Sequence, residues 1–271
     1  MPVPKKNPLA RQRRVEILSE LEDAGSVRVA ALAKRFGVAE ETIRRDLDRL
    51  SDEGRLARTH GGALSIRNQR FDLPSAVRRN TLAMEKRRIA HQALSHIEAN
   101  DVVAFDASTT VLELVCLLPN MPLTVITYGL EAARLLVDRP EIQVISTGGE
   151  LDAKSVCFLG PIAEESLRKF SINKAFFSCK GIDLERGYSE TSTAHASIKR
   201  LLMQLSSRTF LMADHSKFGV RSMAYSGSIQ SVDVVITDEG TDTSFLTSLN
   251  KAGVDTEVAI SNVLPVAGTT G

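Results

Sequence analysis

The sequence predicts an α/β protein with a small helical domain at its N-terminus and a larger domain built on a mainly parallel sheet. Apolar residues recur at helical spacing in two adjacent segments separated by Gly37, and a short stretch of alternating basic and apolar residues follows. Further along, short apolar runs alternate with helical patterns, which is typical of a parallel sheet covered on both faces. The 271 residues, 43% of them hydrophobic, suffice for two domains.

The expected domain boundaries follow from changes in composition. Residues 1–64 form the first domain, 65–84 a linker, 85–260 the second domain and 261–271 a tail. The linker is polar, contains a proline and shows no sustained period. The segment from Val254 onward is rich in small residues and suggests no activity of its own.

The first domain is predicted to be a winged helix-turn-helix. Gly37 supplies the break that a tight turn between helices needs, and a second helix is expected to begin near Ala39 or Glu40. Gly54 ends that helix, and Arg55–Leu64 alternates around two glycines as a small hairpin would. The apolar positions of the two helices are Val29, Leu32, Ala33 and Phe36, then Ile43, Leu47 and Leu50.

This arrangement predicts docking on duplex DNA. In a helix-turn-helix the first turns of the second helix reach base edges, and its flanks hold phosphates. The alternative is an amphipathic helix pair whose arginines only solvate a surface. The candidate DNA contacts are Thr42, Arg44, Arg45 and Arg49 on the helix, and Arg58 and His60 on the hairpin.

The net charge of +1 hides an asymmetry between the two ends of the chain. Residues 1–70 carry 15 Lys and Arg against 10 Asp and Glu, which is +5, while residues 71–271 carry 19 against 23, which is −4. A basic head on a mildly acidic body fits nucleic-acid binding at one end only. Residues 1–14 are interpreted as a loosely ordered arm that either adds phosphate contacts or does nothing. Those contacts would come from Lys5, Lys6, Arg11 and Arg13.

The cysteines and the chain's N-terminal composition favour a cytoplasmic protein. Cys116, Cys157 and Cys179 are far apart, with no CxxC pair or neighbouring His cluster, so we expect reduced thiols and no zinc site. No signal peptide and no run long enough to span a membrane is recognisable. Neither GxGxxG after a strand nor GxxxxGK[ST] is present, so no dinucleotide or ATP site, and no cofactor or metal, is expected.

The second domain is predicted to be a Rossmann-like α/β domain with a mainly parallel sheet. A helix is expected around Ile89–Ile97 before the first strand. The expected strands are 102–105, 123–127, 143–146, 175–178, 209–213 and 234–237. The expected helices between them are 110–118, 130–137, 162–170 and 194–205. In such sheets, ligands bind at the carboxyl ends of the strands.

Polar loops follow four of these strands and would gather at one edge of the sheet. Asp106, Ser108, Thr109 and Thr110 follow the first strand and open a helix, where hydroxyls and backbone N–H groups suit an anion such as phosphate. The alternative for these residues is plain helix capping. The other three loops are Thr147–Glu150, Cys179–Asp183 and Asp214–Phe218.

The head resembles the DeoR family of bacterial transcription regulators. The resemblance rests on Arg14, Ile17, Leu18, Leu21, Ala33, Phe36, Val38, Thr42–Leu47, Leu50, Gly54, Leu56, Arg58 and His60–Ala63. The family commonly has serine, a good helix N-cap, where Ala39 stands. We therefore expect one missing capping bond, which is worth roughly 1 kcal/mol.

The resemblance extends over roughly Lys86–Asp238 to the family's sensor domain, which is similar to sugar-phosphate isomerases of the ribose-5-phosphate type. It implies a site for a phosphorylated sugar or polyol. The implied effector-binding residues are Asp106, Ser108, Thr109, Thr110, Gly148, Gly149, Lys180, Gly181, Glu190 and Lys217. Lys154 is a further candidate or an ordinary surface lysine, and Glu190 either accepts a sugar hydroxyl or is a solvated carboxylate.

Two departures from the family pattern concern this site. Ala107 stands where the family usually has glycine, and Tyr128 where it usually has asparagine. The alanine restricts the backbone only slightly. The tyrosine either changes the size of the effector that fits or is a buried packing residue.

The leading hypothesis is a DNA-binding repressor of a carbohydrate catabolic operon that is controlled by a phosphorylated sugar. It is expected to act as a homo-oligomer, a dimer or tetramer, on paired half-sites of DNA. The alternative is a sugar-phosphate isomerase-like enzyme fused to a DNA-binding head. Isomerisation needs a carboxylate base. The matching isomerase loop begins with an aspartate and is followed by a glutamate, where this chain has Lys180 and Leu184. The sequence therefore favours a binding protein over an enzyme.

Overall fold

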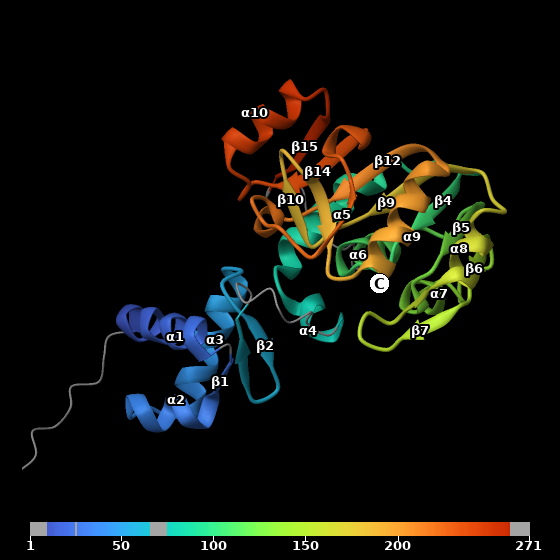
Figure 1. Cartoon of the computed structure of the whole chain (residues 1–271). Coiled ribbons are helices and arrows are strands. Elements are labelled where there is room, and N and C mark those ends of the chain that lie inside the picture. The colour runs from blue at the N-terminus through green and yellow to red at the C-terminus, as the bar shows by residue number, and fades with distance from the viewer. Residues whose placement is uncertain (1–9, 25, 66–74, 261–271) are drawn as a thin grey trace, which may run out of the picture. The chain divides into compact units, whose positions relative to one another are not determined.

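The computed structural model describes residues 10–24, 26–65 and 75–260. The chain divides into two compact units, Met1–Ala83 and Met84–Gly271 (Figure 1). The Lys5 and Lys6 contacts expected of the N-terminal arm, the tail at 261–271 and residues 66–74 of the expected linker lie outside the described residues.

The first unit is a winged helix-turn-helix, as predicted. Its elements are α1 (Ala10–Ala24), β1 (Ser26–Arg28), α2 (Val29–Phe36), α3 (Glu40–Asp52), β2 (Ala57–Thr59), β3 (Gly62–Leu64) and α4 (Ser75–Asn80). Gly37 ends α2 in the left-handed conformation, with φ 66°, and its N–H donates to the Ala33 carbonyl. The three helices α1 to α3 share one core, which includes Ile17, Leu21, Leu32, Phe36, Ile43, Leu47 and Leu50.

The wing contains one strand more than the predicted hairpin. β3 pairs antiparallel with both β2 and β1, so β1, which precedes the helix pair, completes a three-stranded sheet. Gly62 is required at this junction, because a Cβ atom there would lie 1.9 Å from the Val27 carbonyl oxygen. The helix α4 lies within the expected linker and packs against β2. None of its residues is buried, so no apolar period marks it in the sequence.

The second unit is built on a seven-stranded parallel sheet, as predicted. Its order is β15-β14-β12-β9-β4-β5-β6, and every neighbouring pair is parallel. The strands are β4 (Val102–Phe105), β5 (Leu123–Thr127), β6 (Ile142–Ser146), β9 (Ile172–Phe177), β12 (Ser206–Met212), β14 (Val234–Asp238) and β15 (Asp255–Ala259). The strand order reverses direction between β4 and β9, which makes that crevice the topological switch point.

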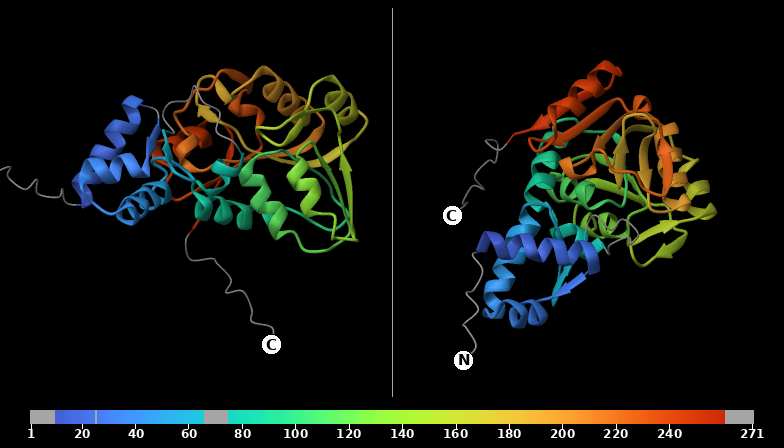
Figure 2. Two further views of the ribbon diagram at one scale, coloured as in Figure 1. Left: turned by 90° about the horizontal axis from the view of Figure 1, so that it is seen from below. Right: turned by 60° about the vertical axis from the view of Figure 1, so that its left-hand side comes forward.

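Helices cover both faces of this sheet (Figure 2). The helices are α5 (Ala83–Leu94), α6 (Thr109–Leu117), α7 (Leu130–Leu135), α8 (Pro161–Leu167), α9 (Thr193–Gln204) and α10 (Thr243–Lys251). Side chains of α5, α6 and α7 pack on one face against Phe105 and Phe176, and side chains of α8, α9 and α10 pack on the other against Ala104 and Phe177. Adjacent strand residues thus enter opposite cores, as strand geometry requires.

Smaller elements extend from the carboxyl edge of the sheet. The strands β7 (Glu150–Asp152) and β8 (Cys157–Leu159) form a hairpin. The strands β10 (Gly181–Asp183), β11 (Gly187–Glu190) and β13 (Ala224–Gly227) form a separate antiparallel sheet. Two short 3₁₀ helices, η1 (His215–Lys217) and η2 (Ile229–Ser231), complete the unit.

The segment from Val254 onward is not merely the inert run that its composition suggested. β15 is the edge strand of the main sheet, and it pairs in parallel with β14 along its whole length. Its sequence, Asp-Thr-Glu-Val-Ala, is partly polar because an edge strand is only half covered, which is why no continuous apolar run announced it. No helix in the described part of the chain is both long and apolar enough to cross a membrane.

Candidate functional site

The helix α3, the second helix of the helix-turn-helix and from here on the recognition helix, begins without a side-chain cap. Ala39 is its N-cap residue, and the alanine side chain makes no capping hydrogen bond, as the sequence predicted. Glu40 and Glu41 occupy the first turn instead, where their negative charge interacts favourably with the positive end of the helix dipole. The helix therefore begins at the predicted position, and acidic residues offset the missing cap.

Arg44 and Arg45 are exposed, as predicted. Their side chains are 47% and 80% exposed, and each pairs with a glutamate one turn away on α3. Arg44 contacts Glu40 at 2.8 Å, and Arg45 contacts Glu41 at 3.6 Å. Exposed pairs of this kind contribute about 0.3–0.5 kcal/mol. A DNA phosphate can replace the carboxylate partner at little cost.

The remaining candidates on the head differ in their freedom to reach DNA. Arg49 is exposed and pairs with Glu53 at 3.3 Å, Thr42 is half-buried, and His60 is exposed in the turn of the wing. Arg58 is more constrained, because its Nε donates to Asp48 at 2.7 Å and its guanidinium also donates to the Gly62 carbonyl. Arg58 thus ties the recognition helix to the wing.

Part of the predicted N-terminal arm is helical. α1 begins at Ala10, so Arg11 and Arg13 lie in a helix rather than in a loose arm. Arg13 is 6% exposed and donates to Asp46, which is itself 5% exposed on α3. The expected phosphate contact from Arg13 is therefore wrong. A buried carboxylate needs a cationic partner, and Arg13 supplies it.

In the second unit, Asp106 organises the crevice between β4 and β9. Its carboxylate accepts the Ser108 N–H at 2.8 Å and the Ser178 N–H at 2.9 Å, so it holds together the loops after both strands. The side chain is buried and also lies 3.1 Å from the Lys199 Nζ. All of these contacts are internal, and they fix the positions of the loops after β4 and β9.

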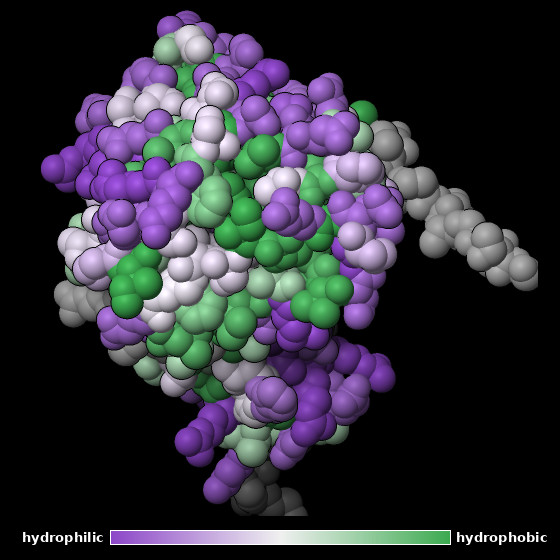
Figure 3. Space-filling view, turned by 90° about the vertical axis from the view of Figure 1, so that its right-hand side faces the viewer, coloured by the Kyte–Doolittle hydropathy of each residue, from purple (hydrophilic) through white to green (hydrophobic). Residues whose placement is uncertain are grey.

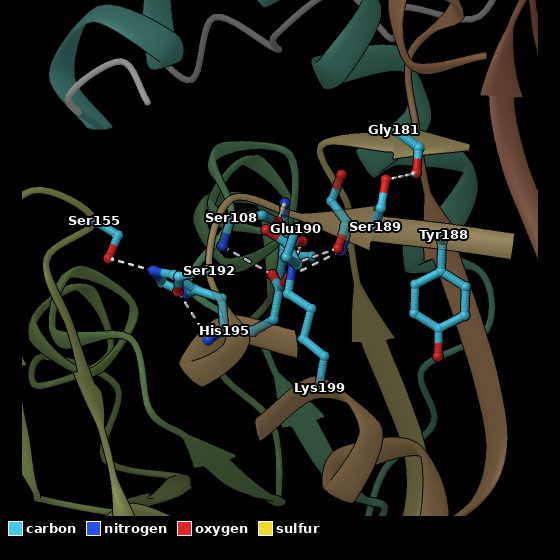
Figure 4. A network of polar contacts seen from close by, with 12 residues as sticks. Ser108, Ser155, Gly181, Tyr188, Ser189, Glu190, Ser192, His195 and Lys199 are labelled. Carbon is cyan, nitrogen blue, oxygen red and sulfur yellow. Dashed lines mark hydrogen bonds and ion pairs between the residues drawn. The ribbon is translucent and has the colours of Figure 1, made fainter. Parts of the chain in front are cut away.

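Lys199 is the central cation of this site, and it was not among the residues predicted from the sequence. Its Nζ lies between Asp106 and Glu190 and donates to both Glu190 and the Ser178 carbonyl (Figure 4). Burial opposes its charge, but the charges of Glu190 and Asp106 outweigh burial and raise the pKa of Lys199 well above its ordinary value. Glu190 is therefore a buried ion-pair partner rather than a solvated carboxylate.

The N-terminus of α6 lies at the same crevice. Ser108 is the N-cap, and its hydroxyl accepts the Val111 N–H at 3.2 Å, so capping is its observed role. Thr109 and Thr110 are 4% and 2% exposed. Their amides stand in the first helical turn, where no intrahelical carbonyl can accept them. The positive end of a nine-residue helix thus points at the site.

The other predicted residues come from loops at the same sheet edge. Gly148 and Gly149 follow β6 with φ 64° and 122°, and Gly148 has open space where a Cβ would stand. Lys180 follows β9, and Lys217 lies in η1 with its side chain 27% exposed. Gly181 has a packing role, because a Cβ there would lie 2.3 Å from the Val220 carbonyl oxygen.

Two buried polar atoms beside these loops lack a hydrogen bond within the described part of the chain. They are the Tyr128 hydroxyl and the Asp214 Oδ2 atom. Burial, followed by the charge of Asp106, raises the pKa of Tyr128 well above its ordinary value. Burial opposes ionisation of Asp214 too, but the charges of Lys217 and Lys86 and the Ser216 hydrogen bond outweigh it and lower the pKa of Asp214. Tyr128 is 1% exposed, so the structure makes it a buried residue beside the site.

The fold and the two groups of side chains define a class of protein, a DNA-binding regulator whose helix-turn-helix head is joined to an α/β sensor domain. The family models agree: a DeoR-like helix-turn-helix domain matches residues 13–69, and a DeoR C-terminal sensor domain matches residues 82–239. The chain belongs to the DeoR family of transcription regulators.

Relatives of this chain match along almost their whole length. An uncharacterised HTH-type transcriptional regulator, YulB of Bacillus subtilis, is 41% identical over 89% of this chain and 93% of its own. An L-fucose operon activator of Haemophilus influenzae is 37% identical over 82% and 89%, and the transcriptional repressor AccR of Agrobacterium fabrum is 36% identical over 86% and 91%.

Solved structures are more distant. Ribose 5-phosphate isomerase from Methanocaldococcus jannaschii aligns over 49% of this chain and 53% of that chain with 14% identity and a TM-score of 0.37. A probable sor operon regulator from Shigella flexneri aligns over 59% and 86% with 12% identity and a TM-score of 0.40. At these scores the likeness carries no weight for function.

Proposed function

We propose that this regulator is a repressor of a carbohydrate catabolic operon and that a phosphorylated sugar or polyol controls its affinity for operator DNA. One observation carries the effector class. The N-terminus of α6 follows β4 and Lys180 follows β9, at the topological switch point of a parallel sheet, and Lys217 follows the neighbouring strand β12. The first amides of a helix and nearby ammonium groups at such a crevice suit a phosphate.

The sugar part of the effector would contact the two buried atoms that make no hydrogen bond, one of which, Asp214 Oδ2, lies 3.7 Å from the Lys217 Nζ. Asp214 Oδ2 can accept a sugar hydroxyl, and the Tyr128 hydroxyl can donate to one. An unsatisfied buried polar atom costs about 1–3 kcal/mol, so a ligand hydroxyl beside the Tyr128 hydroxyl would relieve that cost. In this proposal, Asp214 takes the hydroxyl-binding role that the sequence had suggested for Glu190.

Regulation follows from differential affinity. An effector that prefers the conformation with weak DNA affinity lowers the affinity for operator DNA. The size of this effect is set by the ratio of the effector's affinities for the two conformations. The L-fucose operon activator and the repressor AccR among the relatives are named for both signs of regulation, and one name refers to a sugar. We infer repression by this protein, acting in the cytoplasm, with a sugar phosphate as the releasing signal.

The Asp183 carboxylate is poorly suited to act as the base that the alternative function, isomerisation, needs. This carboxylate accepts the Glu185 and Arg186 N–H groups at 3.1 and 2.9 Å, and it pairs with Arg221 at 2.5 Å. The hydrogen bond from Arg221 lowers the pKa of Asp183, which makes it a weaker base. We therefore infer a binding protein rather than an enzyme.

A homo-oligomer fits this function, because paired half-sites match two-fold symmetric proteins. Apolar residues gather on the sensor face shown in Figure 3. Leu130 on α7, Leu151 on β7 and Ile162 on α8 are 37%, 51% and 69% exposed, on elements that neighbour one another through β8. We propose that a second copy of the chain covers this face.

Calorimetric titration of the full-length protein tests the effector class. Sugar phosphates and their unphosphorylated sugars are compared pairwise, with Lys217→Ala as the binding variant and Lys169→Ala, a lysine outside the proposed site, as the matched control. We expect a phosphorylated compound to bind at least about tenfold more tightly than its parent sugar, a difference of ~1.4 kcal/mol, and Lys217→Ala to reduce that preference. Equal binding of both forms would contradict the proposal.

A further inference from the structure

Three potential metal ligands converge beside the proposed effector site, two from one hairpin and one from a helix far along the sequence. Asp152 ends β7, Cys157 begins β8, and His195 lies in the first turn of α9. The Asp152 and His195 side chains and the Cys157 Sγ each offer one ligand atom, and these three atoms all lie within 4.8 Å of one another. The His195 Nε2 is 3.4 Å from the Asp152 Oδ2.

The Ser155 hydroxyl marks the point at which the three ligand atoms meet. It donates to the Asp152 Oδ2, and it lies 3.1 Å from the Cys157 Sγ and 3.2 Å from the His195 Nε2. Figure 4 shows the contact between Ser155 and His195. A single small group therefore already touches a carboxylate, a thiol and an imidazole.

We propose that Asp152, Cys157 and His195 form a binding site for a transition metal ion of the zinc type. Thiolate, imidazole and carboxylate together are a donor set that suits Zn²⁺. Zinc bonds of about 2.0–2.3 Å place tetrahedral ligand atoms about 3.3–3.8 Å apart, and the His195–Asp152 separation falls in that range. Rotation of Ser155 about its Cα–Cβ bond opens the central position, and water supplies the fourth ligand.

The surroundings of the cluster fit a bound cation with an entry path. Cys157 is buried, while the His195 and Asp152 side chains are 11% and 33% exposed, so the cluster opens to solvent on the Asp152 side. Glu190 and Asp106 face the cluster with negative charge, and Lys199 and Lys180 face it with positive charge.

A metal here would tie the β7–β8 hairpin to α9, the helix that carries Lys199. The site goes beyond the proposed sugar-phosphate response and does not depend on it. The competing interpretation is a closed hydrogen-bonded network in which Ser155 serves as the permanent centre. In the metal-site interpretation Ser155 rotates away and the Cys157 sulfur binds the metal, whereas in the network interpretation both groups are hydrogen-bond partners. Substitutions of these residues distinguish the two.

The test is titration of tag-free, metal-stripped, reduced full-length protein with Co²⁺, followed by displacement with Zn²⁺. Cobalt bound to a thiolate gives a sulfur-to-metal charge-transfer absorption band. We expect that band in the wild type and its loss on addition of Zn²⁺. Cys157→Ser and His195→Ala remove ligands and should weaken binding at least ~100-fold, beyond the range seen for outer-shell changes.

Two further variants sharpen the result. Ser155→Ala removes the hydroxyl that occupies the proposed metal position, so this variant should still give the charge-transfer band. If the three residues form only a hydrogen-bonded network around Ser155, no cobalt should bind. Cys116→Ser, an exposed cysteine on α6, is the matched control and should bind cobalt like the wild type. Tyrosine fluorescence checks that each variant is folded.

The inference is overturned if the wild type gives no thiolate band at millimolar Co²⁺. It is equally overturned if a folded Cys157→Ser protein keeps wild-type affinity, or if Cys116→Ser alone abolishes the band. Neither result bears on sugar-phosphate binding, which the calorimetric comparison of phosphorylated and unphosphorylated sugars measures separately.

Discussion

Replacing Lys199 with methionine tests the buried ion-pair network at the centre of the sensor domain. Lys199, Asp106 and Glu190 have side chains that are 7%, 0% and 2% exposed. The network holds one cation between two carboxylates, so it carries one net negative charge. Lys199→Met raises that to two buried negative charges without a counterion.

The expected cost follows from the uncompensated charge. Removing one partner of a buried ion pair costs about 3–5 kcal/mol, because the remaining charge is left in a medium that solvates it poorly. Glu190→Gln is the matched comparison, since it keeps the shape and a carbonyl acceptor for Lys199 and leaves the network neutral. We expect that variant to cost no more than about 1.5 kcal/mol.

Urea unfolding followed by tyrosine fluorescence measures this cost in the sensor unit alone. The chain has no tryptophan, and its three tyrosines, Tyr128, Tyr188 and Tyr225, all belong to the second unit. With an m value of about 3 kcal/mol/M, the expected loss moves the midpoint by roughly 1–1.7 M. The double variant Lys199→Met/Glu190→Gln restores one net negative charge and should be more stable than Lys199→Met. Equal costs for the two single variants would refute the reasoning.

Three further predictions follow from the structure. Arg45→Ala should weaken operator binding and lower the magnitude of the slope of log affinity against log salt concentration by about one. Its unfolding midpoint should not change, because the side chain is 80% exposed and its ion pair with Glu41 is weak. The hydrogen bond from His215 to Asp238 raises the pKa of His215, so its stabilising contribution is present below the unfolded value of about 6.5 and is lost as pH rises through the folded pKa. The stability difference between wild type and His215→Gln should therefore be larger at acid than at alkaline pH in urea unfolding. Ile162→Asp should shift the protein to a smaller species in size-exclusion chromatography with light scattering, because it places a charge on the apolar face.

Each of these has a clear contrary result. Unchanged operator affinity for a folded Arg45→Ala protein would remove this residue from the DNA interface. A His215 difference that grows as pH rises would mean that the charged imidazole is not favoured by Asp238. An unaltered molar mass for Ile162→Asp would place the subunit contact elsewhere.

Elements with a regular apolar pattern were predictable from the sequence. The turn at Gly37, the recognition helix and the first six strands of the sheet stand where periodicity and turn chemistry put them. The strand β15 and the helix α4 were not, since an exposed edge strand and a helix without buried residues leave no apolar signal. Local patterns reveal elements with several buried apolar side chains, which β15 and α4 lack.

The site was less predictable, because it depends on which loops the topology brings together. The loop after β4 could be assigned to the carboxyl edge of the sheet, but Lys199 comes from the middle of α9 and is a core lysine. Its only signal was a lysine beside Ile198, Leu201 and Leu202 on an otherwise apolar face. Spacing along the chain could not reveal the meeting of Asp152 with His195 either, since these residues are 43 positions apart in the sequence.

Fluorescence anisotropy measures whether a sugar phosphate controls the affinity of this protein for operator DNA. A labelled fragment from upstream of this gene's own operon is titrated with the full-length protein, and the complex is then challenged with a panel of sugar phosphates. We predict tight, salt-sensitive binding that one phosphorylated sugar or polyol reverses. Absence of specific binding at any salt concentration, or binding that no sugar phosphate alters, would contradict the account.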